Sequence, residues 1–485
     1  MATSATAIEE AVETNIPARM DRLPWSRWHW LIVAGLGITW ILDGLEVTIV
    51  GALASVLTEK GTLSLTESQI GFAATLYLLG GILGALFFGY LTDRLGRKRL
   101  FMITLGLYLV STVLTAFSWS FWSFVAFRFL TGAGIGGEYA AINSAIDELI
   151  PARVRGWADL AINGSWWIGT AIGAASTLVL LNPSLLSHSI GWRLCFGLGA
   201  FLGLAILMVR RILPESPRWL MTHGKMEEAE RVVKSIEAEV AGEGGVEKLP
   251  KAEGSIKIQQ RGSIGFGRIA DVMWNKYRKR ASLGMALMIS QAFMYNAIFF
   301  TYALVLSQFY KVPSGSVGLY ILPFALGNFL GPLTIGRLFD TIGRRAMIAI
   351  TYTISGLLLA ATAFLFAQGA LTATTQTIAW SVIFFFASAS ASSAYLTVSE
   401  VFPMEMRAMA IAFFYAIGTA AGGLFAPWLF GILIGTHDKN ILSLGYYAGA
   451  ALMLMAAGAE IFIGVAAERK PLEEVAEPLS VASPA

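Results

Sequence analysis

Long apolar runs separated by short polar connections dominate the chain. A helix of about 20 apolar residues crosses the hydrocarbon core of a bilayer, so each long run predicts a membrane-spanning helix. Six runs precede the polar segment 212–279 and six follow it. The twelve runs cover approximately 28–56, 69–91, 100–118, 122–146, 157–181, 193–211, 280–307, 316–338, 346–367, 376–400, 408–435 and 443–467.

The polar segment contains the sequence KMEEAERVVKSIEAEV, in which acidic residues precede basic residues by four positions. This spacing is typical of a soluble amphipathic helix. We expect the stretch Gly242–Gly267 beside it to be loosely ordered. The predicted parts are an N-terminal tail (1–27), a six-helix bundle (28–211), a helical linker (212–279), a second six-helix bundle (280–467) and a C-terminal tail (468–485).

Composition supports an integral membrane protein. Of the 485 residues, 56% are hydrophobic and 14% are charged, whereas soluble domains average about 25% charged residues. The net charge of +3 gives no reason to expect nucleic acid as a partner. With Cys195 as the single cysteine and no histidine in the middle of a span, we expect neither a disulfide framework nor a metal site.

Lysine and arginine are distributed very unevenly between the two sets of loops. If the N-terminus lies inside, nearly all of the 35 basic residues fall in inner segments. By the positive-inside rule, both termini are cytoplasmic and the protein crosses the cell (inner) membrane many times. The first 24 residues are polar, so we expect no cleavable signal peptide. The basic residues expected outside are Lys60, Arg193, Lys311 and Lys439, and Arg128 lies within a span.

The two halves repeat each other. GYLTDRLGRKR (89–99) matches GRLFDTIGRR (336–345), and ELIPARVRG (148–156) matches EVFPMEMRA (400–408). Duplicated six-helix units occur in the major facilitator superfamily. We therefore predict an all-α membrane protein in which two pseudo-symmetric six-helix bundles are joined by a cytoplasmic helical linker.

The glycines of RFLTGAGIGGE (128–138) fit the dinucleotide-binding pattern G-x-G-x-x-G. That pattern requires a preceding strand and a helix that begins at the glycines. Gly132, Gly134 and Gly137 instead lie in the middle of an apolar run, where small residues allow two membrane helices to approach closely. We interpret them as packing residues and expect no enzyme.

Several motifs, taken in order, resemble the sugar porter family of the major facilitator superfamily. They are DRLGRKR after span 2, RFLTGAGIGGE in span 4, ELIPARVRG after span 4, PESPRWL after span 6, DTIGRR after span 8 and SEVFPMEMRA after span 10. The resemblance implies a transporter for small molecules that works by alternating access. It does not identify the solute, because carriers of organic acids and other metabolites share most of these motifs.

Two acids in span 1 and one arginine in span 4 are candidates for proton coupling. Ionisable residues inside a membrane are costly and functional by default. Rise per residue places Asp43 about 10 Å, and Arg128 about 9 Å, below the outer edge of a hydrocarbon core of about 30 Å. This depth favours Asp43 as the partner of Arg128. The resemblance favours Glu46, which stands where proton-coupled sugar porters carry an acid, while DGLE followed by Gly51 is similar to the DG-x-D motif of aromatic-acid/proton symporters.

The resemblance also implies a solute pocket and a cytoplasmic gate. By offset from the motifs, the implied solute-contacting residues are Asn163, Gln291, Asn296, Asn328 and Tyr395. The residues of the implied gate are Asp93, Arg97, Glu148, Arg155, Asp340, Arg344, Glu400 and Arg407. We expect them to form exposed ion pairs that are individually weak. Departures such as Ser290 before Gln291 and SASASSAY (388–395) in span 10 weaken the case for a hexose.

The leading hypothesis is proton-coupled symport of a sugar or a similar small polar solute, with the proton as coupling ion and no other cofactor. The alternatives are symport of an organic acid, such as an aromatic acid, and passive uniport. A non-transporting receptor is disfavoured by the short C-terminal tail. We expect the partners to be the solute and the lipid bilayer, and the protein to be a monomer.

Overall fold

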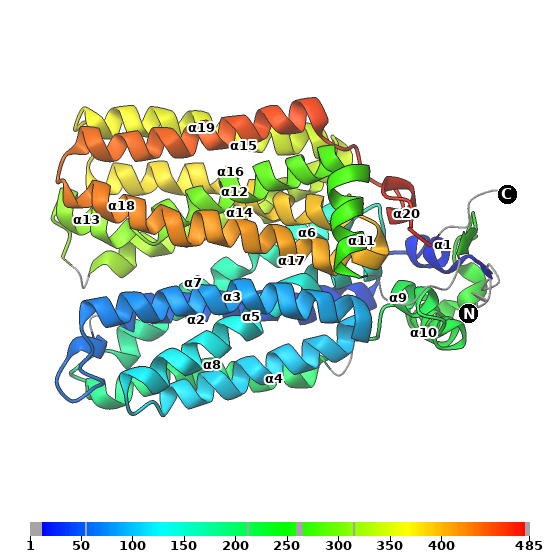
Figure 1. Cartoon of the computed structure of the whole chain (residues 1–485), viewed down its shortest axis with the longest axis horizontal. Helices are drawn as coiled ribbons and strands as arrows, with labels where there is room; N and C mark the ends of the chain where they lie inside the picture. Colours follow the sequence, from blue (N-terminus) through cyan, green and yellow to red (C-terminus); the bar gives the residue numbers. More distant parts are fainter. Residues whose placement is uncertain (1–11, 54–55, 211–212, 259–264, 314–315, 481–485) are drawn as a thin grey trace, which may run out of the picture.

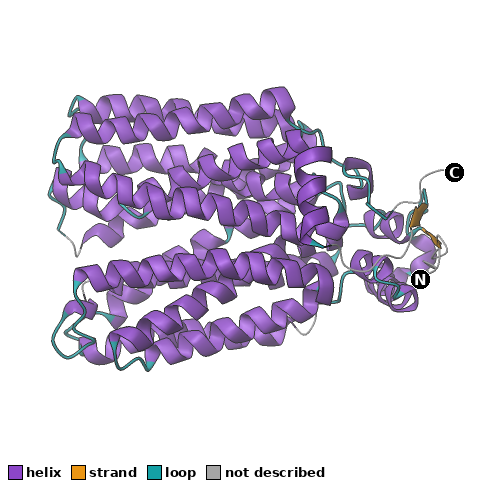
Figure 2. Ribbon diagram, in the orientation of Figure 1, coloured by secondary structure: helices purple, strands orange, loops and turns teal. Residues whose placement is uncertain are grey.

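The computed structural model describes residues 12–53, 56–210, 213–258, 265–313 and 316–480, and these residues are almost entirely helical (Figure 2). The first bundle contains α2 (Arg27–Leu53), α3 (Glu67–Leu95), α4 (Arg97–Ala116), α5 (Phe121–Leu149), α6 (Arg155–Gly164), α7 (Trp166–Leu180) and α8 (His188–Arg210). The second contains α12 (Arg278–Phe299), α13 (Tyr302–Tyr310), α14 (Val317–Thr341), α15 (Arg344–Ala367), α16 (Ala373–Glu400), α17 (Arg407–Gly418), the π-helical η7 (Thr419–Leu424), α18 (Phe425–Gly435) and α19 (Lys439–Ile463).

The two bundles lie side by side with their helices along the long axis of the molecule (Figure 1). Within the described ranges, nine helices are long and apolar enough to cross a membrane. Some predicted spans are interrupted: the fifth is divided into α6 and α7, the seventh into α12 and α13, and the eleventh contains η7. The predicted all-α membrane fold is confirmed.

Glycines bring α3 and α5 into close contact. A β-carbon on Gly136 would lie 2.0 Å from the carbonyl oxygen of Gly81, and one on Gly132 would lie 2.1 Å from that of Tyr77. A β-carbon on Gly134 would lie 2.9 Å from the backbone nitrogen of Tyr108, and one on Gly137 would lie 2.7 Å from the side chain of Phe88. The packing interpretation of the glycine-rich segment is confirmed.

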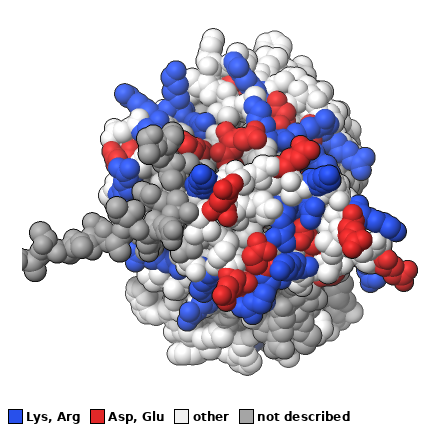
Figure 3. Space-filling model, turned by 90° about the vertical axis from the view of Figure 1, so that its right-hand side faces the viewer, with Lys and Arg blue, Asp and Glu red and all other residues white. Residues whose placement is uncertain are grey.

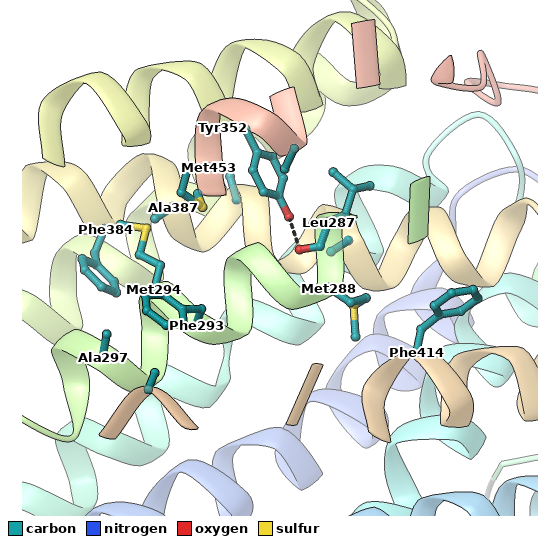
Figure 4. Close-up of a cluster of buried hydrophobic side chains, with 14 of the residues drawn as sticks. Leu287, Met288, Phe293, Met294, Ala297, Tyr352, Phe384, Ala387, Phe414 and Met453 are labelled. Atoms are coloured by element: carbon teal, nitrogen blue, oxygen red, sulfur yellow. Dashed lines mark hydrogen bonds between the residues drawn. The ribbon is translucent and has the colours of Figure 1, made fainter. Parts of the chain in front are cut away.

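Large apolar side chains fill the second bundle. Figure 4 shows Met288, Phe293 and Met294 of α12 among side chains from α15, α16, α17 and α19. The hydroxyl of Tyr352 donates to the carbonyl oxygen of Leu287 at 3.0 Å, which satisfies the polar tip of a fully buried ring.

One end of the molecule, here named the charged end, carries short elements outside the two bundles (Figure 1). They are β1 (Val12–Thr14), α1 (Ile16–Asp21), α9 (Pro217–Thr222), α10 (Met226–Ala241), β2 (Ile256–Ile258), α11 (Phe266–Asp271) and α20 (Leu472–Val475). Basic and acidic side chains are gathered together on this end (Figure 3). The stretch expected to be an amphipathic helix forms α10.

The N-terminal segment is bound to the linker. β1 pairs antiparallel with β2, so the expectation that 242–267 is loosely ordered is wrong for Ile256–Ile258 and for the short helical turns Gly242–Gly244 and Val246–Lys248. Residues 249–255 form neither helix nor strand, and 259–264 lies outside the described residues. Arg19 contacts Glu237 at 2.6 Å, and Arg22 contacts the same carboxylate at 2.5 Å. Burial raises the pKa of Glu237, but hydrogen bonds from the two arginines outweigh this effect and hold the pKa below its ordinary value of 4.5.

The contact between α3 and α5 predicts a stability difference between two glycine substitutions. Gly136→Ala places a methyl group against backbone, which cannot move aside, so the melting temperature of the purified protein should fall by several degrees. Gly106→Ala in α4 is the matched control, because a β-carbon there meets nothing within 4 Å. Equal melting temperatures for the two variants would contradict the packing described here.

Candidate functional site

A cavity of about 390 Å³ lies between the two bundles, within the range of volumes typical of small-molecule sites. Both halves contribute to its lining. Its polar and charged lining residues are Asp43, Arg128, Asn163, Gln291, Asn296, Ser388, Ser392 and Thr419. Its aromatic lining residues are Trp40, Tyr77, Phe124, Tyr139, Trp166, Trp167, Tyr295, Phe299, Phe300, Tyr395 and Tyr415.

Asp43 accepts two hydrogen bonds on one oxygen. The hydroxyl of Tyr139 donates to Oδ2 at 2.5 Å and Nε1 of Trp166 donates to it at 2.8 Å. The other oxygen, Oδ1, is buried without a hydrogen-bond partner among the described residues. Glycine permits this arrangement: a β-carbon on Gly44 would lie 2.0 Å from the carbonyl oxygen of Trp166, so only glycine lets α2 and α7 approach closely enough.

Both donors to Asp43 also contact the second bundle. The ring of Tyr139 stacks on that of Tyr415 at 4.5 Å and lies parallel to that of Tyr395 at 6.1 Å. Trp166 meets Phe299 of α12 edge to face at 5.7 Å. The carboxylate on α2 is therefore connected through two aromatic side chains to the opposite half.

Arg128 forms an ion pair with Glu46. Its guanidinium also lies over the ring of Tyr77, 4.2 Å from the centroid, and both charged side chains are almost completely buried. The depth estimate that favoured Asp43 as the partner of Arg128 is wrong. Depth does not specify the direction in which a side chain leaves its helix, and the long arginine side chain reaches Glu46, one turn beyond Asp43.

Four of the five residues implied as solute contacts line the cavity: Asn163, Gln291, Asn296 and Tyr395. Asn328 does not belong to this lining. It is fully buried, and its oxygen accepts from the hydroxyl of Tyr295 at 2.7 Å while its nitrogen donates to Phe324 at 2.9 Å. Asn328 thus holds a lining tyrosine in place from behind the cavity wall.

At the charged end, each half binds the start of a helix from the other half. Asp340 of α14 accepts from the backbone N–H groups of Gly156 and Trp157 at 3.1 and 2.8 Å. In the pseudo-symmetric position, Asp93 of α3 accepts from those of Ala408 and Met409 at 3.3 and 3.0 Å. Neither α6 nor α17 has a side-chain cap of its own, so the carboxylates satisfy otherwise unpaired donors and stabilise the positive ends of the helix dipoles.

Ion pairs surround these two caps. Arg97 contacts Glu148 at 2.9 Å, and Arg344 contacts Glu400 at 3.0 Å. Contacts between the halves are longer: Arg155 lies 3.6 Å from Glu400, and Arg407 lies 3.5 Å from Glu148. The expectation of exposed pairs is wrong, because all eight predicted gate residues are buried, and removing one partner of a buried pair costs far more than removing one from an exposed pair.

Sequence reasoning missed several residues of this region. Tyr139 and Trp166 carry no motif that predicts a bond to Asp43, since aromatic residues are frequent in all spans. Asp147 and Asp159 are fully buried acids that were detectable as acids near the ends of predicted spans. Asp21 of the N-terminal segment contacts Arg155 at 3.4 Å and Arg218 at 3.0 Å, and nothing in the linear sequence indicates this contact.

The caps between the halves predict a local change in hydrogen exchange. Asp340→Ala removes the acceptor of two amides at the start of α6, so the backbone amides of 155–160 should exchange faster. Asp438→Ala is the matched control, because Asp438 caps α19 by accepting from the amide of Asn440 and makes no contact with α6. Mass-spectrometric exchange that is unchanged in the first variant would contradict the capping role.

Comparisons with known proteins agree with this architecture. Residues 43–478 match the family model for sugar (and other) transporters. The chain is 25% identical to the niacin transporter NiaP of Acinetobacter baylyi over 95% of this chain and 99% of that protein. It is 29% identical to myo-inositol transporter 2 of Schizosaccharomyces pombe over 86% of this chain and 76% of that protein. The proton:xylose symporter XylE bound to 6-bromo-6-deoxy-D-glucose superposes with a TM-score of 0.77 at 20% identity, covering 92% of this chain and 98% of that chain. The chain therefore belongs to the sugar porter family of the major facilitator superfamily and is a transporter rather than an enzyme.

Proposed function

We propose that the protein is a proton-coupled symporter of a small organic solute, and that Asp43 carries the coupling proton. The observation that supports this proposal is the position of Asp43 in the cavity lining with one carboxylate oxygen bound twice and the other unpartnered in the described part of the chain. A buried carboxylate with incomplete hydrogen bonding is costly when charged. Protonation removes that cost.

Glu46 has a different function in this proposal. Its negative charge offsets that of Arg128 within a buried pair, so the pair contributes little net charge to the cavity. The charge of the cavity is then set by Asp43, which changes by one unit when it binds a proton. Because Tyr139 and Trp166 link Asp43 to the second bundle, its protonation would alter the contacts between the halves.

The charged end would face the cytoplasm, in agreement with the positive-inside rule. The cross-half caps at Asp93 and Asp340 would keep that side closed while the solute enters from the opposite side. Rocking of the two bundles would then break the caps and the ion pairs around them. Asn163, Gln291, Asn296 and Tyr395 would contact the solute.

Two solute classes fit different parts of the lining. Amides at Asn163, Gln291 and Asn296 offer donors and acceptors to hydroxyl groups, which favours a sugar or polyol, and the family model supports this candidate. The stacked rings around Tyr139 favour a planar organic acid, and the niacin transporter among the relatives supports this second candidate. Protonated Asp43 would tolerate a carboxylate that ionised Asp43 would repel.

Substituting the two acids of α2 should have different effects. Asp43→Asn should abolish the dependence of uptake on an imposed pH gradient in proteoliposomes and leave the melting temperature nearly unchanged. Glu46→Gln should destabilise the protein by about 3–5 kcal/mol, because it leaves Arg128 buried without a charge partner. Gradient-dependent uptake that survives in Asp43→Asn would exclude Asp43 as the proton carrier, and gradient independence of the unsubstituted protein would indicate uniport.

A panel of probes separates the solute classes. Thermal stabilisation of the purified protein should be measured with D-xylose, myo-inositol and nicotinate, each at pH 5.5 and pH 7.5. Stabilisation by nicotinate that is stronger at the lower pH, together with its loss in Trp166→Phe, supports the planar acid. Stabilisation by either polyhydroxylated probe, reduced in Gln291→Ala, supports the sugar class.

A further inference from the structure

A stripe of buried polar side chains leads from the cavity toward the charged end. On α5, Tyr139, Asn143 and Asp147 follow one another at intervals of four residues, and residues at this spacing lie on one face of a helix. On α6, Asp159 and Asn163 are also four residues apart. Tyr139 and Asn163 line the cavity, whereas both aspartates lie farther toward the charged end.

The two helices are joined along this stripe by hydrogen bonds. The side-chain nitrogen of Asn143 donates to the backbone oxygen of Tyr139 at 2.8 Å. That of Asn163 donates to the side-chain oxygen of Asn143 at 3.4 Å and to the backbone oxygen of Asp159 at 2.9 Å. At the end of the stripe nearest the cavity, the hydroxyl of Tyr139 donates a hydrogen bond to Asp43.

Asp159 is a carboxyl group with little to stabilise a charge. It is fully buried, and neither of its oxygens has a hydrogen-bond partner in the part of the chain that the structure describes. Asp147 of α5 and Glu400 of α16 repel a negative charge at this position, while Arg344 of α15 and the side-chain amide of Asn163 favour it. Of the other elements against α6, α14 contributes Asp340, which binds the backbone at the helix start, and α2 contributes Asp43.

Asp147 lies in a different electrostatic environment. It is fully buried, but its Oδ2 is 3.8 Å from Nε of Arg407, and Arg155 also attracts its charge, while Glu400 repels it. Both arginines belong to the ion pairs that join the halves at the charged end. Asp147 therefore lies beside arginines of the contacts between the halves, and opening of the charged end would expose Asp147 before Asp159.

We propose that Asp159 and Asp147 form the path by which the proton leaves Asp43 for the charged end. Asp159, protonated at rest, gives its proton to the carboxylate of Asp147, which releases it to water. The carboxyl group of Asp43 then returns a proton to Asp159, so that Asp43 and Asp147 end as carboxylates and Asp159 ends protonated. Asn163 at the cavity wall is one helical turn, about 5.4 Å of rise, from Asp159, so water molecules that enter from the cavity past Asn163 would carry the proton from Asp43 to Asp159. This path rests on the proposed function of Asp43, but its test does not require the solute.

Infrared spectra of the reconstituted full-length protein test the path through the carbonyl band of protonated carboxylic acids. Asp159→Asn should remove one such band from the difference between acidic and alkaline buffer, and Asp43→Asn should remove another. After transfer to D₂O, deuterium can reach Asp159 from Asp43 or from Asp147, so the exit side is tested in the Asp43→Asn background. Adding Asp147→Asn to that background should slow deuteration of the Asp159 band several-fold. Deuteration of the Asp43 band should stay unchanged in Asp147→Asn alone, because the cavity supplies Asp43 with water directly.

Glu460→Gln is the matched control. Glu460 of α19 is fully buried, and its oxygens also have no hydrogen-bond partner in the described ranges, but it lies outside the stripe. The Glu460→Gln variant should lose a different carbonyl band and leave the deuteration rate of the Asp159 band unaffected. The path is overturned if Asp159→Asn removes no band, or if adding Asp147→Asn to Asp43→Asn leaves the deuteration rate of Asp159 unchanged. Absence of an Asp43 band alone would instead reject the proposed function.

Discussion

The arrangement of the two halves depends on how buried charge is satisfied at their interface. Asp93 and Asp340 each occupy the uncapped start of a helix that belongs to the opposite half. Each half therefore supplies donors that the other needs, and the interface at the charged end is held by polar contacts. Such contacts can exchange for hydrogen bonds to water when the halves separate, whereas an apolar interface of the same size would have to expose its hydrophobic surface.

The cavity has the opposite character, since aromatic rings dominate its lining. The hydroxyl of Tyr139 and Nε1 of Trp166 donate hydrogen bonds to Asp43, and the rings of both residues contact the second bundle. A change at the carboxylate therefore acts on contacts between the halves without a long chain of intermediates. The hydrogen bond from Trp166 to Asp43 also joins α7 to α2, which approach each other closely at Gly44.

Much of this fold can be read from the sequence because membrane insertion imposes simple rules. Run length predicted the spans, and the duplicated motifs predicted two related bundles. The glycines of α5 were correctly interpreted because a pattern without its strand cannot bind a dinucleotide. The rotation of each helix was not predictable, so depth alone favoured the wrong one of the two candidate partners of Arg128, while the resemblance favoured the right one, and Asn328 was placed in the cavity. Contacts between distant segments, such as β1 with β2, depend on tertiary packing that no local pattern encodes.

Two acids on one helix face at first resemble a redundancy. Their surroundings suggest a division of functions instead. An arginine facing the cavity alone would hold any nearby carboxylate in its charged form and would bind anions at every pH. Glu46 prevents both effects by pairing with Arg128, and in the proposed mechanism this leaves Asp43 to respond to protons without a fixed positive charge bound to it. In this view the ion pair is the static element of the site, and the single carboxylate beside it is the element that changes.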